Sequence, residues 1–97
     1  MILKLINRKT EEDEYQAIQF TNIDDIGEIQ EWLKKYSASS EIRTMHSSGI
    51  KYLVIYQDCM INIAEPGDYI IKNSANHFNC IAKKDFYREF IIDAYIW

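Results

Sequence analysis

The chain has 97 residues and a formal net charge of −4. This length predicts one domain, residues 1–97, that folds without help from a metal or a disulfide. The acidic balance argues against nucleic acid as a direct partner, because phosphates attract a basic surface, and it suits a partner that is itself basic. Residues 1–6 are too short for the apolar part of a secretory signal, and no apolar stretch approaches the length of a membrane span, so we expect a cytoplasmic protein.

The first third of the chain predicts a strand followed by a helix. Residues 1–9 alternate loosely and suit an edge strand or an ordered arm, whereas residues 15–20 alternate clearly and predict a half-buried strand. Residues 21–36 predict a helix that Thr21 or Asn22 can cap. Its apolar stripe at helical spacing comprises Ile26, Ile29, Leu33 and Tyr36, with Trp32 beside the stripe.

Short strands separated by turns dominate the rest of the chain. A polar loop is expected at 37–40, and the predicted strands cover 41–46, 50–57, 60–64, 68–72 and 77–82. Pro66 and Gly67 suit a type II turn that reverses the chain between two strands of an antiparallel meander. Residues 83–90 predict a short helix, and 91–97 suit either its continuation or a closing strand. The predicted fold class is α+β, with an antiparallel meander packed against one main helix and a short C-terminal helix.

Three blocks of sequence carry a family resemblance. They are "AIQFT" at 17–21, "PGDYIIK" at 66–72, and a closing group formed by Phe78, Asp85 and Phe86. With these blocks, residues 13–90 resemble a family of small phage and prophage proteins, most of them without an assigned function. Residues 73–84 lack the glycines and prolines that many members have there. The resemblance implies a phage-type protein working in the cytoplasm of a bacterial host, and it implies no particular reaction.

The residues that most often carry catalysis have simpler explanations here. Asp58 and Asp68 stand at predicted turns, where aspartate bonds to the local backbone. Cys80 has no basic neighbour in the sequence that would stabilise a thiolate. The glycines are isolated, so no phosphate-binding loop is predicted. We therefore expect a protein that is not an enzyme and has no catalytic residues.

Metal and cofactor sites are not predicted either. Cys59 and Cys80 lie far apart, and His46 and His77 do not complete the spacing of a zinc site. Two free thiols are the favoured interpretation, and a Cys59–Cys80 bridge stays open.

Clustered acids suggest a binding surface. One cluster precedes the first alternating strand and the other lies on the predicted helix; together they comprise Glu11, Glu12, Asp13, Glu14, Asp24, Asp25, Glu28 and Glu31. The simplest interpretation is a solvated loop and a solvated helix face. The functional hypothesis is an acidic surface that docks on a host protein with a basic surface, such as a nucleic-acid channel, as an anti-CRISPR or other inhibitor of host defence would.

Other functions stay open. A small-ligand protein, for example a sponge for a nucleotide signal, would need basic side chains from separate strands to converge, and the candidates are Arg43, Lys51 and Lys72. A component of the virion or of its assembly is a third possibility. The aromatic end of the chain, with Tyr95 and Trp97, suits either a partner site, including a homodimer, or a tail folded on its own domain.

Overall fold

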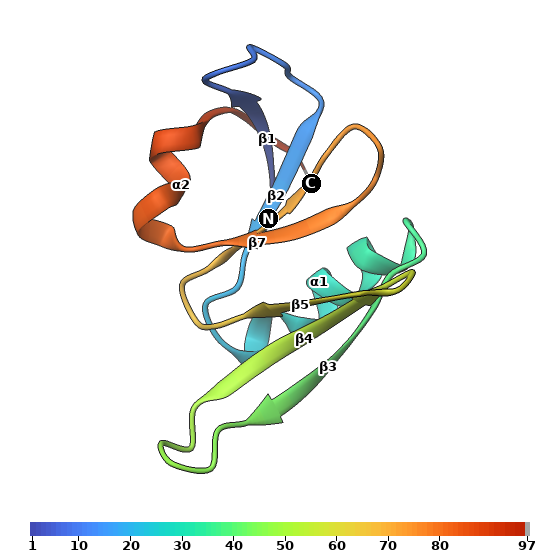
Figure 1. Ribbon diagram of the computed structural model, residues 1–97, viewed down its shortest axis with the longest axis vertical. Coiled ribbons are helices and arrows are strands. Elements are labelled where there is room, and N and C mark those ends of the chain that lie inside the picture. The colour runs from blue at the N-terminus through green and yellow to red at the C-terminus, as the bar shows by residue number, and fades with distance from the viewer. Residues whose placement is uncertain (97) are drawn as a thin grey trace.

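The computed structural model describes residues 1–96, and it is mixed α and β (Figure 1). Within those residues eight strands form two antiparallel sheets, accompanied by two α-helices. The five-stranded sheet has the order β7-β6-β2-β1-β8 and consists of β1 (Ile2–Asn7), β2 (Tyr15–Gln19), β6 (Tyr69–Lys72), β7 (Phe78–Ile81) and β8 (Phe90–Ile96). The three-stranded sheet consists of β3 (Ser39–Thr44), β4 (Lys51–Gln57) and β5 (Met60–Ala64). The helical segments are η1 (Ile23–Asp25), α1 (Ile26–Lys34) and α2 (Lys83–Glu89).

The predicted α+β class is confirmed, but the single meander is wrong. Gly67 has φ of +101°, and Asp68 N–H donates to the Glu65 carbonyl at 2.9 Å, so the predicted turn forms. However, β5 before the turn and β6 after it belong to different sheets. The reason is that the turn docks on Phe20, which accepts from Gly67 N–H at 2.7 Å and donates its own N–H to the Asp68 carbonyl at 2.9 Å. These bonds extend the β2–β6 pairing and direct β6 away from β5.

Both ends of the chain enter the five-stranded sheet. The predicted edge strand, β1, lies inside it, because β8 pairs along its outer side from Ile2 opposite Ile96 to Asn7 opposite Phe90. The ambiguity at 91–97 is resolved in favour of a strand as far as Ile96. Trp97 lies outside the described residues, so only Tyr95 of the two aromatic residues in the predicted tail is described.

The five-stranded sheet is covered on both faces. Along β2, Ile18 packs in a cluster with α1 and β4, while its neighbour Ala17 packs in a second cluster with Phe86 of α2. Because neighbouring residues of a strand point to opposite faces, α1 and the three-stranded sheet cover one face and α2 covers the other. The Tyr69 and Phe86 rings stack with centroids 3.7 Å apart in the second cluster.

The main helix is shorter than predicted. Asn22 caps η1 by accepting from Asp24 N–H, and α1 ends at Lys34. Trp32, predicted to lie beside the apolar stripe, is buried in the core, where its ring packs edge-on against Phe78. Its indole N–H donates to Gln16 Oε1 at 3.2 Å, so this polar group is satisfied inside the protein. Only the start of the predicted 37–40 loop is a loop, since β3 begins at Ser39.

Two amide side chains join the sheets. Gln57 on β4 accepts from Phe78 N–H at 3.1 Å and donates to the Asn76 carbonyl at 2.7 Å. Asn62 on β5 donates to the Phe78 carbonyl at 3.1 Å. These bonds satisfy backbone groups of Phe78 on β7, an edge strand of the five-stranded sheet.

Candidate functional site

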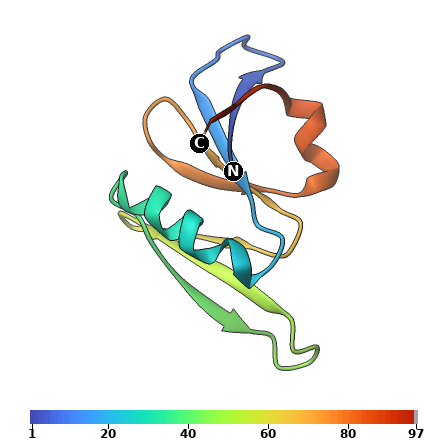
Figure 2. The same ribbon diagram turned by 180° about the vertical axis from the view of Figure 1, so that it is seen from behind.

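The two predicted acidic clusters lie apart. Glu11, Glu12, Asp13 and Glu14 are all exposed in the β1–β2 loop, at the top of Figure 2, whereas the remaining four belong to η1 and α1. Asp13 and Glu14 line a cleft that also includes Lys4 and Lys72, so their charge is partly offset there. Asp25 and Glu28 line a different cleft. The acids of the helical segment therefore form a surface separate from that of the β1–β2 loop.

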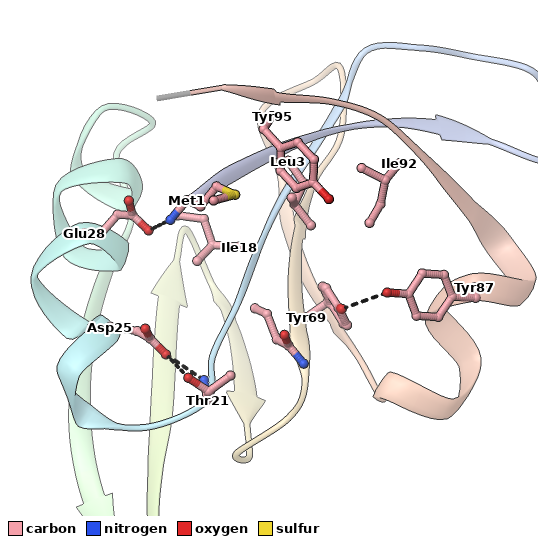
Figure 3. Close-up of a pocket in the computed structure, with 11 residues that line it drawn as sticks. Met1, Leu3, Ile18, Thr21, Asp25, Glu28, Tyr69, Tyr87, Ile92 and Tyr95 are labelled. Atoms are coloured by element: carbon pink, nitrogen blue, oxygen red, sulfur yellow. Dashed lines mark hydrogen bonds and ion pairs between the residues drawn. The ribbon is translucent and has the colours of Figure 1, made fainter.

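The cleft beside the helical segment brings carboxylates and tyrosines together (Figure 3). It has a volume of about 350 Å³ and receives side chains from Met1, β1, β2, η1, α1, β6, α2 and β8. Its lining comprises Met1, Leu3, Ile18, Gln19, Thr21, Asp25, Glu28, Tyr69, Tyr87, Ile92 and Tyr95. Figure 3 shows the carboxylates of Asp25 and Glu28 on the helical side and the tyrosines of α2 and β8 on the other.

The carboxylate of Asp25 has a structural task. Its Oδ2 accepts from the Thr21 hydroxyl at 2.6 Å, from Thr21 N–H at 2.7 Å and from Asn22 N–H at 3.2 Å. Burial by itself would raise the pKa of Asp25, but the hydrogen bonds from Thr21 and Asn22 outweigh it and lower the pKa. Asp25 is thus a charged cap as well as part of the cleft wall.

The carboxylate of Glu28 already holds a cation. Its Oε1 is in contact with the Met1 ammonium, and the pair is solvent-accessible. Asp24 and Glu31 are exposed, so the helical segment presents three carboxylates to solvent besides Asp25. An ammonium or guanidinium from another molecule would meet the same carboxylates at this end of the cleft.

The opposite wall is built by tyrosines. Tyr69 is buried, and its hydroxyl oxygen lies 3.5 Å from that of Tyr87, longer than an ordinary hydroxyl–hydroxyl hydrogen bond. Burial and the neighbouring Tyr87 raise the pKa of Tyr69, so its hydroxyl stays neutral and able to donate. Tyr87 and Tyr95 are 51% and 60% exposed, which leaves much of each ring open to a ligand. These tyrosines come from β6, α2 and β8, so no sequence spacing could have grouped them.

The basic residues of the alternative ligand site do not converge. Arg43 lies on the outer face of the three-stranded sheet with Glu41 and Tyr56. Lys51 lies opposite Thr44, the residue after Arg43 on β3. Since neighbouring residues of a strand point to opposite faces, Lys51 lies on the face of the sheet opposite to Arg43. Lys72 is buried in the other sheet, with its Nζ 4.5 Å from the centre of the Tyr36 ring. The structure offers no shared pocket for the three.

The remaining predicted residues have local roles. Asp68 Oδ2 accepts from Glu65 N–H at 2.9 Å, which is the predicted turn role. Cys59 and Cys80 are free thiols, and burial, aided by Asp68, raises the pKa of Cys80 to about 12. Within residues 1–96 no group of three or more histidine, cysteine, aspartate or glutamate side chains is arranged to hold a metal ion. In the same part of the chain, no helix has the length and apolar character needed to cross a bilayer.

Comparison with known proteins adds no family to this picture. No protein-family model, curated protein or solved structure matches the chain.

Proposed function

We propose that this protein acts by binding a basic protein surface, without catalysing a reaction, through the cleft of Figure 3 and the exposed carboxylates beside it. The observation that carries the proposal is the pairing of two chemistries in one cleft. Carboxylates of Asp25 and Glu28 stand at one end and accessible tyrosine rings at the other. A lysine or arginine side chain of the partner would enter with its cationic head towards the carboxylates and its stem against Tyr87 or Tyr95.

Physical chemistry favours a cation in this cleft. A guanidinium is attracted both by carboxylates and by the faces of aromatic rings. The exposed Asp24 and Glu31 belong to the same helical segment as Asp25 and Glu28 and extend the negative field that guides a basic partner. Since these charges are accessible to ions, added salt weakens the attraction.

The wider role proposed is a phage or prophage accessory protein that inhibits a host defence system, in the manner of an anti-CRISPR protein. The family resemblance and the acidic surface support it, because a basic nucleic-acid channel is a surface that such a cleft suits.

A small-ligand function is less supported, since Arg43, Lys51 and Lys72 stand apart. A virion or assembly role would use the same surface with a structural partner.

The test uses two variants with equal charge changes. The triple variant Asp24→Asn/Glu28→Gln/Glu31→Gln removes the exposed charges of the helical segment, including Glu28 in the cleft wall, and spares the cap Asp25. The matched control Glu11→Gln/Glu12→Gln/Asp13→Asn removes the same charge from the β1–β2 loop. Each is titrated with a defined arginine-rich peptide, followed by calorimetry and by the NMR signals of Tyr87 and Tyr95. We expect the triple variant to bind about tenfold more weakly, with the control close to the parent chain.

Equal weakening by both variants would contradict the proposal, because it would show a response to net charge and not to the cleft. The peptide with glutamine in place of each arginine should leave the tyrosine signals unmoved. Capture from a bacterial lysate at low and high salt, with the same two variants, then identifies the partner. A partner that the triple variant loses and the control retains would support the role in host-defence inhibition only if it belongs to a defence system.

A further inference from the structure

The sheet edges differ in how they are protected. Phe78 on the β7 edge has its backbone groups bonded by Gln57 and Asn62, and the β8 edge has a register shift opposite Lys4 and Leu5. Such shifts and side-chain covers discourage pairing with another chain. β5 lies beside β7, to which Asn62 connects it. β3 is the outermost strand at the lower right of Figure 1, and no neighbouring strand in residues 1–96 covers its outer side.

A groove follows the free edge of β3. It has a volume of about 450 Å³ and is lined by Ala38, Ser39 and Ser40 on one side and by α1 on the other. The helix contributes Gly27, Gln30, Glu31 and Lys34, which share one helix face. Gly27 lies in the first turn of α1, and a Cβ built on it would meet nothing within 4 Å, so the groove is open at this end. Ser40 Oγ is shielded from solvent and has no hydrogen-bond partner within the described residues.

The backbone groups that point outward from β3 can be identified. Met45 N–H donates to the Ile50 carbonyl at 2.9 Å, which sets the phase of the β3–β4 ladder. Residues of an antiparallel strand alternate between bonding their neighbour and facing away. Arg43 and Glu41 therefore bond to β4, whereas Thr44, Ile42 and Ser40 direct N–H and C=O to the outside. An added strand would find three residues ready to pair.

We infer that β3 pairs antiparallel with β3 of a second copy of this chain, with Ile42 opposite Ile42 of the second copy. In this register Glu41 faces Arg43 of the second copy, and Arg43 faces its Glu41. Ser40 faces Thr44 of the second copy, so the solvent-shielded hydroxyl of Ser40 gains a hydroxyl partner. The outward N–H and C=O groups of Ser40, Ile42 and Thr44 are all satisfied across the two-fold axis.

The charges on β3 favour pairing with a second copy of this chain and not with an unrelated strand. In the single chain Arg43 Nε donates to Glu41 Oε1 at 2.9 Å, and the Tyr56 hydroxyl contacts the same oxygen. The Tyr56 hydroxyl, followed by Arg43, lowers the pKa of Glu41, so the carboxylate is charged at neutral pH. One negative and one positive residue, two apart and flanking Ile42, form a pattern complementary to itself when reversed. The two-fold axis also places both α1 helices on the same face of the joined sheet.

Charge exchange across the two-fold axis provides the test. The variants Glu41→Arg and Arg43→Glu each place like charges opposite one another, and we expect about tenfold weaker self-association of either. Mixing the two variants pairs opposite charges again, although each chain retains its own like-charged pair. Sedimentation velocity over a range of concentrations should therefore show a dimer for the parent chain and a heterodimer for the mixture. Glu12→Arg, with the same charge change in the β1–β2 loop, is the control.

Amide hydrogen exchange gives a second measurement. Dimer formation should slow exchange at Ser40, Ile42 and Thr44, while Glu41 and Arg43 are already bonded to β4. A parent chain that stays monomeric at all concentrations would overturn the inference, as would single variants that dimerise like the parent. Failure here leaves the cleft of Figure 3 unaffected, because none of its lining residues belongs to β3.

Discussion

The two sheets of this protein use their surfaces differently. The five-stranded sheet is buried on both faces, and every residue of β6 is buried. The three-stranded sheet buries Leu53 and Ile55 against the core but exposes Ile61 and Ile63 on its outer face. A sheet covered on both sides contributes mainly to stability, whereas a sheet with an open face and a free edge is available to partners.

The largest expected effect is a difference in stability between a variant in the five-stranded sheet's core and a variant on the open face of the three-stranded sheet. Phe86→Ala removes a fully buried ring that stacks on Tyr69 of the five-stranded sheet, and we expect a loss of about 3–5 kcal/mol in the free energy of unfolding. Ile63→Ala on the open face should cost about 0.5 kcal/mol or less. Denaturant unfolding of both variants measures the contrast. Similar losses would mean that the open face is covered in solution.

The junction between the sheets should give an intermediate effect. Gln57→Ala leaves Phe78 N–H without its acceptor and the Asn76 carbonyl without its donor, so we expect a loss of about 1–3 kcal/mol. The amide of Phe78 should exchange with solvent faster. Gln30→Ala, at an exposed position of α1, serves as the control and should change neither quantity. Unchanged exchange at Phe78 would show that the β7 edge does not depend on Gln57.

The smallest effect concerns the cap of the helical segment and depends on pH. Because the pKa of Asp25 is lowered by folding, the folded chain binds this proton less tightly than the unfolded chain. Its stabilisation is therefore complete above about pH 5 and is lost as the pH falls through about 4 and below. Asp25→Ala should cost about 1 kcal/mol at pH 7, and the difference from the parent chain should disappear near pH 2.

The exposed neighbour Asp24 is the control for this prediction. Asp24→Ala removes a charge from the same segment without removing the three hydrogen bonds that Asp25 accepts. At pH 7 it should cost less than Asp25→Ala. A pH-independent loss for Asp25→Ala would assign its role to packing instead of charge.

Much of the local structure could be predicted from the chain alone. Alternation identified β2 and β5, the run at 50–57 identified β4, and all three bounds agree to within about two residues. The Asn22 cap and the turn at Gly67 followed from residue chemistry. The burial of Trp32 was missed because it depends on Gln16 and Phe78, which are distant in sequence. The tyrosine wall of the cleft was missed for the same reason.

The sequence by itself determined most of the strands and the position of both helices, because apolar period, caps and turn residues act over a few neighbouring positions. It did not determine the state of residues 91–96, which became a strand through pairing with β1. Only the tertiary structure decided that β5 and β6 separate into two sheets, that β1 lies inside one of them, and that β3 retains a free edge. These outcomes depend on long-range backbone pairing, such as that of Phe20 with Gly67 and Asp68. Every strand carries the same backbone N–H and C=O groups, so the residues of one strand do not specify which strand it pairs with. The packing of the whole chain selects the pairing.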